Sequence, residues 1–494
     1  MMLHRLLLPW LAALLWALPA HAELPVPVSE ALSRAGIPQE NVAVYVQQVD
    51  SAQPLISHYA DQAYSPASVM KLLTTYAALD MLGPAYRWQT EVFRDGPLQH
   101  GVLDGNLIIK GHGDPYFRTE DFWQLLTYLR QSGIRQINGN LVLDDSFFAP
   151  LAEDPGAFDG EPYRAYNALP DALLVNFKAT SFRLVPDSDG HKVNIYPNPD
   201  VAEIQVDNRL KLTEGGCGDW KHRLQYAVEP VAEGDGSAKT DRVRIHFTGS
   251  YAQDCGEKAL ELSLLNDGGY AYSLFRKLWQ ELGGTFNGGL QHGPMLQDAV
   301  LLAQYQSPPL AEIVRSINKY SNNLMTRQLL LTLGAEYNGV PGTEAGGETA
   351  IHQWLSNKQM DFPELVMENG SGLSRIARIS AAHLSWLLLD AYRSPVMPEL
   401  MSSLPIPAVD GTLKSRLKDS GVAGRAHIKT GSLEGVRSIA GYVLDHDGRR
   451  WAVVFLVNHP LAWKAADAQD ALIDWVYDHD ETAGHGSPRH CCHH

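Results

Sequence analysis

A long stretch of short strand patterns, from about residue 88 to residue 290, constrains the fold of this chain more than any other feature. Short apolar runs alternate there with Gly, Asp and Pro, which is typical of β-rich structure. The flanking segments mix strand patterns with longer helical patterns, as at 310–333 and 381–392. The 494 residues are more than one compact core usually holds. We therefore expect two or three domains, with the β-rich stretch as an insertion.

Strand patterns at the two ends of the chain predict one shared sheet. Residues 42–46 alternate as a strand does, and 54–59 can return beside them after a turn. Near the end, 438–444 and 451–457 flank the hairpin signal Asp445-His446-Asp447-Gly448, and a helical pattern covers 463–476. We expect these strands to form an antiparallel sheet with helices on both faces.

The first 22 residues have the pattern of a secretory signal peptide. His4 and Arg5 precede an apolar run at 6–18, and Ala20-His21-Ala22 offers the small residues that signal peptidase accepts. The apolar run is too short to cross a bilayer. We therefore expect an exported chain without a transmembrane span after cleavage.

Charge and cysteine usage narrow the partners and the compartment. The formal net charge of −16 argues against a nucleic-acid partner. In an oxidising compartment, Cys217 and Cys255 are expected to form a disulfide. Cys491 and Cys492 lie in a Cys/His-rich tail that we expect to be disordered rather than a metal site. The histidines are scattered and no His-Glu-x-x-His segment is present, so neither a metal nor another cofactor is predicted.

Ser68 and Lys71 form the first motif with chemical meaning. They are three residues apart at a predicted helix start, where residues at this spacing share a face, and Ser65 is expected to cap the helix. The Lys71 amine can take the Ser68 proton if burial and nearby cations lower its pKa. The pattern alone is unspecific, because it recurs at 316–319 and 415–418.

Two further polar motifs follow in order. Ser321-Asn322-Asn323 can place a proton relay, Ser321, and a carbonyl-binding amide, Asn323, on one bend; its alternative is an ordinary helix cap. Lys429-Thr430-Gly431-Ser432 follows an apolar run and is expected on an edge strand. Its lysine and threonine can fix a carboxylate, and its glycine lets a substrate backbone approach closely. Together the three motifs supply what acyl transfer to a serine needs.

The ordered trio resembles the signature of penicillin-recognising serine enzymes. The chain is most similar to one family among them, the class C low-molecular-mass penicillin-binding proteins of peptidase family S13. Roughly 250 residues separate Lys71 from Ser321, which resembles the inserted domains of that family. Four further segments resemble it, at 105–115, 141–146, 369–375 and 409–413.

Three departures from the family pattern are visible. Asn322 and Asn369 stand where aspartate is frequent in the family, and we expect neither change to destroy the chemistry. The segment 161–167 lacks the Trp-Asn-Asp pattern common before the corresponding stretch. This departure bears on recognition of a diaminopimelate-type side chain more than on catalysis.

The resemblance implies a serine D-Ala-D-Ala carboxypeptidase and endopeptidase. Ser68 would attack the penultimate D-alanine carbonyl, and Lys71 would accept its proton. Ser321, helped by Lys429, would pass a proton toward the leaving amine. Backbone N–H groups of Ser68 and Ser432 would form the oxyanion hole. Substrate-binding positions would be Asn323, Lys429, Thr430, Gly431 and Ser432.

The resemblance also implies an architecture and partners. It predicts an α/β multidomain protein whose transpeptidase-like or β-lactamase-like domain, an antiparallel sheet flanked by helices, is interrupted by two nested β-rich domains. The implied partners are peptidoglycan peptides and β-lactams in the periplasm, with a homodimer left open. The predicted limits are a signal peptide at 1–22, the first part of the transpeptidase-like domain at 23–90, the inserted domains at 91–290, its second part at 291–480 and the tail at 481–494.

Two alternatives remain from the sequence. A serine β-lactamase shares the trio, but no Glu-x-x-Leu-Asn segment of the class A type lies between Asn323 and Lys429. A catalytically silent envelope protein that binds peptidoglycan is the other. It is disfavoured because Ser68, Lys71 and Ser321 are all present.

Overall fold

The computed structural model describes residues 23–187, 189, 191–231, 242–265 and 268–479. The predicted signal peptide and the predicted disordered tail both lie outside the described residues. Within the described part of the chain, no helix is both long and apolar enough to span a membrane.

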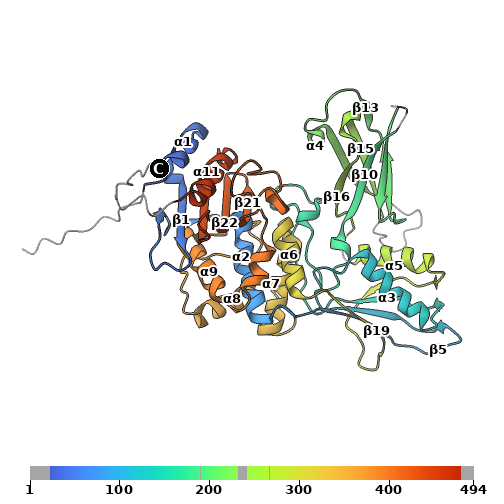
Figure 1. The fold of residues 1–494 in the computed structure, drawn as a ribbon. Coiled ribbons are helices and arrows are strands. Elements are labelled where there is room, and N and C mark those ends of the chain that lie inside the picture. Colours follow the sequence, from blue (N-terminus) through green and yellow to red (C-terminus); the bar gives the residue numbers. More distant parts are fainter. Residues whose placement is uncertain (1–22, 188, 190, 232–241, 266–267, 480–494) are drawn as a thin grey trace, which may run out of the picture.

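A five-stranded antiparallel sheet is the centre of one half of the molecule (Figure 1). Its strands, in spatial order, are β2 (Ile56–His58), β1 (Val42–Gln48), β23 (Arg450–Asn458), β22 (Val436–Leu444) and β21 (Ala426–Leu433). Val42 pairs with Val457, so the two ends of the chain build this sheet together. The predicted sheet and its late hairpin are confirmed.

Helices cover both faces of this sheet. On one face lie α1 (Val26–Ala35) and α11 (Ala466–Tyr477), which share an apolar core with it. The other face packs against a larger core that includes α2 (Lys71–Leu82). Residues 71–79 of α2 are all buried, which explains why this helix has no polar face. Further helices in this core are α6 (Leu310–Tyr320), α7 (Asn323–Asn338), α8 (Glu344–Asn357), α9 (Ala381–Arg393) and α10 (Met397–Ser403).

The region between α2 and α6 forms the other half of the molecule. Its inner part contains two helices that the sequence did not predict, α3 (Thr119–Gln131) and α5 (Gly269–Glu281). One sheet consists of β18 (Leu290–His292), β9 (Leu141–Asp144), β7 (Leu107–Gly111), β4 (Gln89–Arg94) and β19 (Val300–Gln306). A second consists of β17 (Thr285–Phe286), β8 (Gln136–Ile137), β6 (Val102–Leu103) and β5 (Leu98–Gln99).

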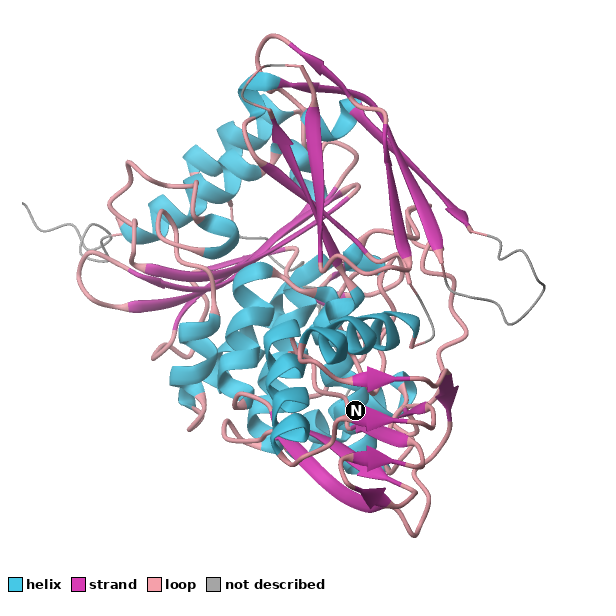
Figure 2. Cartoon of the chain, turned by 90° about the vertical axis from the view of Figure 1, so that its right-hand side faces the viewer, coloured by secondary structure: helices cyan, strands magenta, loops and turns pink. Residues whose placement is uncertain are grey.

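A lobe of long strands is nested within this inner part (Figure 2). A disulfide joins Cys217 to Cys255 there, as predicted. One sheet has the order β11 (Val193–Asn198), β10 (Thr180–Pro186) and β16 (Lys258–Leu262). The other contains β12 (Ile204–Asn208), β15 (Val243–Ala252), β13 (Lys211–Thr213) and β14 (Leu224–Pro230), with the short α4 (Trp220–Arg223) beside them.

Strand pairing bears on the predicted end of the inserted region at residue 290. β19 pairs antiparallel with β4, although β19 begins ten residues after the predicted end at 290. Since β19 is an edge strand of the inserted sheet, we propose Gln306 as the end of this region.

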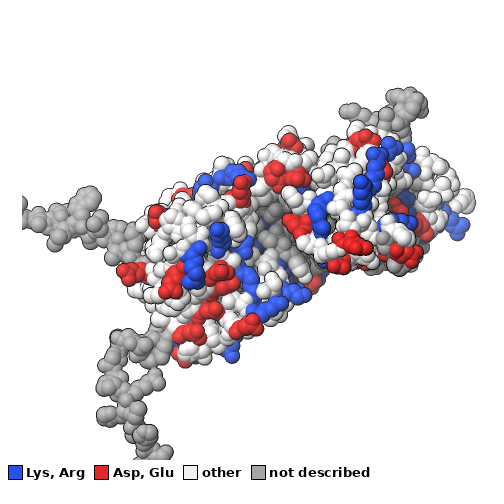
Figure 3. All heavy atoms as spheres, turned by 90° about the horizontal axis from the view of Figure 1, so that it is seen from above, with Lys and Arg blue, Asp and Glu red and all other residues white. Residues whose placement is uncertain are grey.

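Short elements complete the description. A two-stranded pair is formed by β3 (Ala63–Tyr64) and β20 (Ile379–Ser380). The 3₁₀ helices besides the one at the site are η1 (Gln39–Asn41), η3 (Ala165–Asn167), η4 (Asn176–Lys178), η5 (Gln253–Cys255), η6 (Gly411–Leu413) and η7 (Ala462–Lys464). On the face seen from above, Lys and Arg are interspersed with Asp and Glu (Figure 3).

Candidate active site

Ser68 lies in a single 3₁₀ turn, η2 (Ala67–Met70), which continues directly into α2. The residue before it, Ala67, has a φ of 46°, in a left-handed region that non-glycine residues seldom occupy. The Ser438 hydroxyl on β22 donates to the Pro66 carbonyl at 2.6 Å. The sheet therefore holds the turn in this unusual conformation, a common arrangement at functional sites.

The expected capping role of Ser65 is wrong. No side chain caps η2. The backbone N–H of Ser65 instead donates to Asn458 Oδ1 at 2.8 Å, and its carbonyl accepts from Asn458 Nδ2 at 3.0 Å. One carboxamide at the end of β23 thus anchors the turn to the sheet, so tertiary contacts take over the task of the predicted local cap.

Lys71, the first residue of α2, contacts the Ser68 hydroxyl. Its Nζ lies 2.9 Å from Ser68 Oγ, 2.7 Å from Asn323 Oδ1 and 2.6 Å from the Ser371 carbonyl oxygen. Its side chain is fully buried. Burial, and secondly the nearby Lys429 amine, hold the pKa of Lys71 well below its ordinary value. A neutral amine that contacts a serine hydroxyl can accept its proton.

The second motif lies at the junction of α6 and α7, and its residues divide between two tasks. Asn322 caps α7, because its Oδ1 accepts from the Met325 backbone N–H at 3.0 Å. Ser321 has a φ of 57° and contacts Lys429, while Asn323 contacts Lys71. The helix-cap alternative is therefore correct for Asn322, whereas Ser321 and Asn323 lie beside the two lysines and their roles in catalysis stay a prediction.

Lys429 on β21 is the second buried cation of the site. Its Nζ donates to Ser321 Oγ at 2.8 Å and to the Thr430 carbonyl at 2.7 Å. Burial lowers the pKa of Lys429 to about 7. Among the described residues, neither this lysine nor Lys71 forms a carboxylate ion pair. Both amines are held by neutral oxygens, which leaves their protons easy to lose.

Gly431 is needed for a reason that differs from the expected one. A Cβ at this position would lie 2.2 Å from Ser438 Oγ, 2.7 Å from the Pro66 carbonyl oxygen and 3.0 Å from the Ser68 backbone nitrogen. The close approach is therefore between β21 and the turn that carries the serine. Glycine brings this strand edge against the Ser68 N–H, where an oxyanion would sit.

Four residues of the site were not assigned as site residues from the sequence. The Ser371 carbonyl contacts Lys71, and Asn369 orients that loop by accepting the Ser371 N–H at 3.0 Å. Thr412 Oγ1 lies 2.7 Å from Thr430 Oγ1, and Arg437 Nη1 donates to Ser432 Oγ at 2.8 Å. The segments at 369–375 and 409–413 were noted only as family-like, whereas Arg437 on β22 gave no local signal because only strand pairing brings it beside Ser432.

Comparison with known proteins agrees with this geometry. The D-Ala-D-Ala carboxypeptidase 3 (S13) family matches residues 26–478. A D-alanyl-D-alanine carboxypeptidase DacB from Haemophilus influenzae is 26% identical over 420 residues, 85% of each chain. A D-alanyl-D-alanine carboxypeptidase from Actinomadura sp. strain R39 is 29% identical over 463 residues, which are 90% of this chain and 82% of that protein.

A solved structure supports the same assignment. Penicillin-binding protein 4 (dacB) from Haemophilus influenzae has a TM-score of 0.74 and 25% identity, covering 91% of this chain and 100% of that chain. The fold class expected from the sequence is confirmed by this likeness. The chain therefore belongs to the D-Ala-D-Ala carboxypeptidase 3 (S13) family and is a serine DD-peptidase, as the ordered motifs predicted.

Proposed function

We propose that Ser68 is the nucleophile of this peptidase and that Lys71 is its general base. The single observation that carries the proposal is the 2.9 Å contact between Lys71 Nζ and Ser68 Oγ. The Lys71 side chain is fully buried, and no carboxylate of the described residues pairs with it. Burial lowers the pKa of this amine and so favours its neutral form, which is the form that accepts a proton.

In the first half-reaction, Ser68 Oγ attacks the carbonyl carbon of the penultimate D-alanine. The hydroxyl proton passes to Lys71 Nζ as the C–O bond forms. Backbone N–H groups of Ser68 and Ser432 stabilise the resulting oxyanion, each such donor contributing roughly 3 kcal/mol. The position of Gly431 against the Ser68 nitrogen supports this placement of β21.

Collapse of the intermediate breaks the C–N bond and leaves an ester on Ser68. The departing amine takes up the proton that Lys71 received, relayed through Ser321, which is hydrogen-bonded to Lys429, so that Lys71 is neutral again. Water then attacks the ester and gives its proton to Lys71, which returns it to Ser68 Oγ as the acid leaves. Asn323 aligns the peptide from the Lys71 side.

The third motif is proposed to bind the substrate carboxylate. Thr430 and Ser432 present hydroxyls that Thr412 and Arg437 orient, and Lys429 adds a cation when protonated. A carboxylate held by hydroxyl and ammonium donors beside the scissile bond fits a C-terminal D-alanine. The same site accommodates an endopeptidase substrate if the leaving amine belongs to a second stem peptide.

β-Lactams and peptidoglycan peptides are the proposed ligands, and the periplasm is the proposed location. The Haemophilus influenzae protein has been solved in complex with a novel β-lactam, with a TM-score of 0.70 to this chain. The predicted signal peptide and the Cys217–Cys255 disulfide support export to an oxidising compartment. A homodimer stays a prediction, which light scattering on the purified chain tests.

The deciding experiment is mass spectrometry after incubation with benzylpenicillin. Wild type should gain the mass of one penicilloyl group on Ser68, whereas Ser68→Ala should gain none. A wild-type chain that stays unmodified, or an adduct that persists in Ser68→Ala, would contradict the proposal. Release of D-alanine from a pentapeptide separates a working enzyme from a silent binding protein, and rapid steady-state turnover of nitrocefin would favour the β-lactamase alternative.

A further inference from the structure

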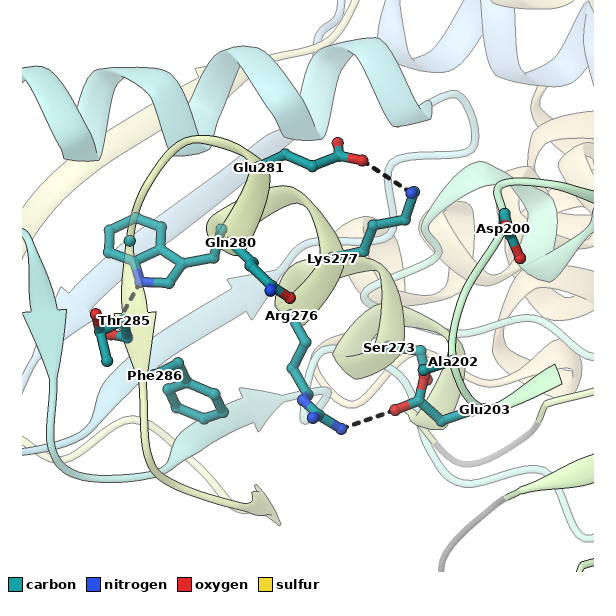
Figure 4. A pocket seen from close by; sticks show the side chains of 12 residues that line it. Asp200, Ala202, Glu203, Ser273, Arg276, Lys277, Gln280, Glu281, Thr285 and Phe286 are labelled. Carbon is teal, nitrogen blue, oxygen red and sulfur yellow. Dashed lines mark hydrogen bonds and ion pairs between the residues drawn. The ribbon is translucent and has the colours of Figure 1, made fainter.

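A cavity of about 500 Å³ lies in the inserted region, outside the acyl-transfer site. Its walls come from α5, from the start of β17 and from the loop that joins β11 to β12 (Figure 4). The cavity therefore lies where the nested β lobe meets the inner part. Its volume is within the range of small-molecule sites, which are common where domains meet.

Four of the five charged side chains that line the cavity are matched in pairs. Arg276 donates to Glu203 across the cavity at 2.8 Å, and Lys277 pairs with Glu281 at 2.8 Å. Asp200 adds a further carboxylate. Two cationic side chains facing three anionic ones disfavour a phosphate-like ligand. Paired charges instead offer adjacent donors and acceptors to a neutral, hydroxyl-rich ligand.

Two further groups fit such a ligand. The Ser273 hydroxyl, in the cavity wall, is buried and has no hydrogen-bond partner within the described protein, which is unusual for a buried polar atom. Phe286 lines the wall beyond Arg276 and is only partly buried. An aromatic face beside planar polar groups suits a sugar ring, which has an apolar face and a polar edge.

We propose that this cavity binds the glycan of the peptidoglycan substrate, so that the inserted region holds the polymer while the peptide enters the Ser68 site. The inference rests on the proposed function, because it assigns the second component of the same substrate. In peptidoglycan the lactyl carboxyl of the sugar is joined to the stem peptide through an amide bond. The glycan therefore carries no charge at that position, which suits a cavity whose own charges are mostly paired.

The test is calorimetric titration of the full chain with chitotetraose, a neutral β-1,4-linked N-acetylglucosamine tetramer. Wild type should bind it saturably. Arg276→Ala should weaken binding about tenfold because it removes a charged donor, and Ser273→Ala about fivefold because it removes one hydroxyl. Gln280→Ala, at an exposed lining position, gives a variant that does not disturb the fold and should also weaken binding.

Arg183→Ala is the matched control. Arg183 pairs with Glu257 at 2.7 Å and is 48% exposed, against 46% for Arg276, but it does not line the cavity. This variant should bind chitotetraose as wild type does. The three cavity variants should also raise KM for polymeric peptidoglycan while leaving kcat/KM for a soluble pentapeptide unchanged.

The outcomes separate this inference from the proposed function. Three outcomes would overturn the glycan assignment. They are no saturable binding of chitotetraose, equal affinity for it in all the variants, and binding of inorganic phosphate or a free stem peptide in the cavity instead. Penicilloyl adduct formation on Ser68 is measured on the same samples. Loss of that adduct in wild type would contradict the proposed function but would leave the titration result intact.

Discussion

The acyl-transfer site and the surface of the inserted region treat charged side chains in opposite ways. At the site that carries Ser68, Lys71 and Lys429 are fully buried, and their hydrogen-bond partners in the described part of the chain are all neutral oxygens. In the inserted region, Arg183 and Glu257 pair at the surface, and His246 lies between Asp207 and Glu229 at 2.6 and 3.1 Å.

The difference shows where burial changes the reactivity of lysine side chains. Burial without a counter-charge lowers both lysine pKa values, whereas exposed pairs keep each partner in its ordinary charged form and add little stability. Lys319 is an internal reference in the same half as Ser68. It is buried too, but it pairs with Asp410 at 2.7 Å. Burial lowers the pKa of Lys319 as well, but Asp410 partly offsets that effect. Lys319 therefore has a carboxylate partner that opposes deprotonation, which Lys71 and Lys429 lack among the described residues.

The largest expected effect comes from Lys71→Arg. A guanidinium fills the position but stays protonated, so it cannot accept the Ser68 proton. Acylation by a fluorescent penicillin should slow by about 10³-fold, measured by stopped-flow fluorescence. Lys319→Arg is the control: it keeps its charge and its pair with Asp410, and it should acylate close to the wild-type rate. Comparable acylation rates in Lys71→Arg and Lys319→Arg would contradict the assignment of Lys71 as the reactive lysine.

Gly431→Ala should follow, with acylation slowed by about 10²-fold. The added Cβ would meet Ser438 Oγ at 2.2 Å, so β21 must move away from the Ser68 turn, and a displacement of about 1 Å is enough for such a loss. Gly293→Ala in the inserted region is the control, because a Cβ there meets no atom within 4 Å. The same penicillin assay measures both, and unimpaired acylation in Gly431→Ala would show that the close approach is dispensable.

The sequence predicted the site better than it predicted the scaffold around it. The ordered motifs predict a site at Ser68, Lys71, Ser321, Asn323 and Lys429, and the structure brings all five together. These residues can be found from the sequence because the reactive side chains of each motif are close together in the chain. Their spacing fits one helix turn, one bend or one strand end. Their meeting across such long separations followed from the family resemblance and not from any local rule.

What the sequence missed depends on tertiary contacts. Asn458 anchors the Ser65 backbone, and Arg437 reaches Ser432 only because β21 and β22 pair. In the inserted region, α3 and α5 lie between short strands, where turn residues dominate the local pattern. The local sequence pattern gives no sign that β19 belongs to the inserted sheet, because its partner, β4, lies about 200 residues earlier in the sequence.

Lys429→Met should raise stability while it impairs catalysis. The folded-state pKa of Lys429 is about 7, against 10.5 for an exposed lysine. The unfolded chain therefore binds more protons between these values, and the unfolding free energy rises with pH across that window. Below pH 7 Lys429 is protonated in both the folded and the unfolded chain, and the cost of burying its charge lowers the unfolding free energy in full. Replacing the buried ammonium with an apolar side chain should add about 1–4 kcal/mol at pH 7, measured by urea unfolding.

Lys319→Met is the paired control for that measurement, and its sign should be opposite. It removes one partner of an ion pair and leaves the Asp410 carboxylate without its cation, which destabilises a fold. Stabilisation in both variants would mean that the carboxylate beside Lys319 contributes nothing, and the contrast between paired and unpaired buried lysines would then fail.

The smallest expected effect belongs to His246→Gln in the inserted region. Hydrogen bonds to Asp207 and then to Glu229 raise the pKa of His246 above its ordinary value. A raised folded-state pKa stabilises the fold fully below the unfolded value of 6.5, and the contribution disappears as pH rises through the folded value. The variant should therefore melt slightly below wild type at pH 5.5 and together with it at pH 9, as measured by circular dichroism. Salt should shrink the pH 5.5 difference because exposed charges are screened, whereas the effect of Lys429→Met should persist in salt because that amine is buried. A His246 effect that resists salt would place this cluster in the same class as the active-site lysines and would break the comparison between the two halves.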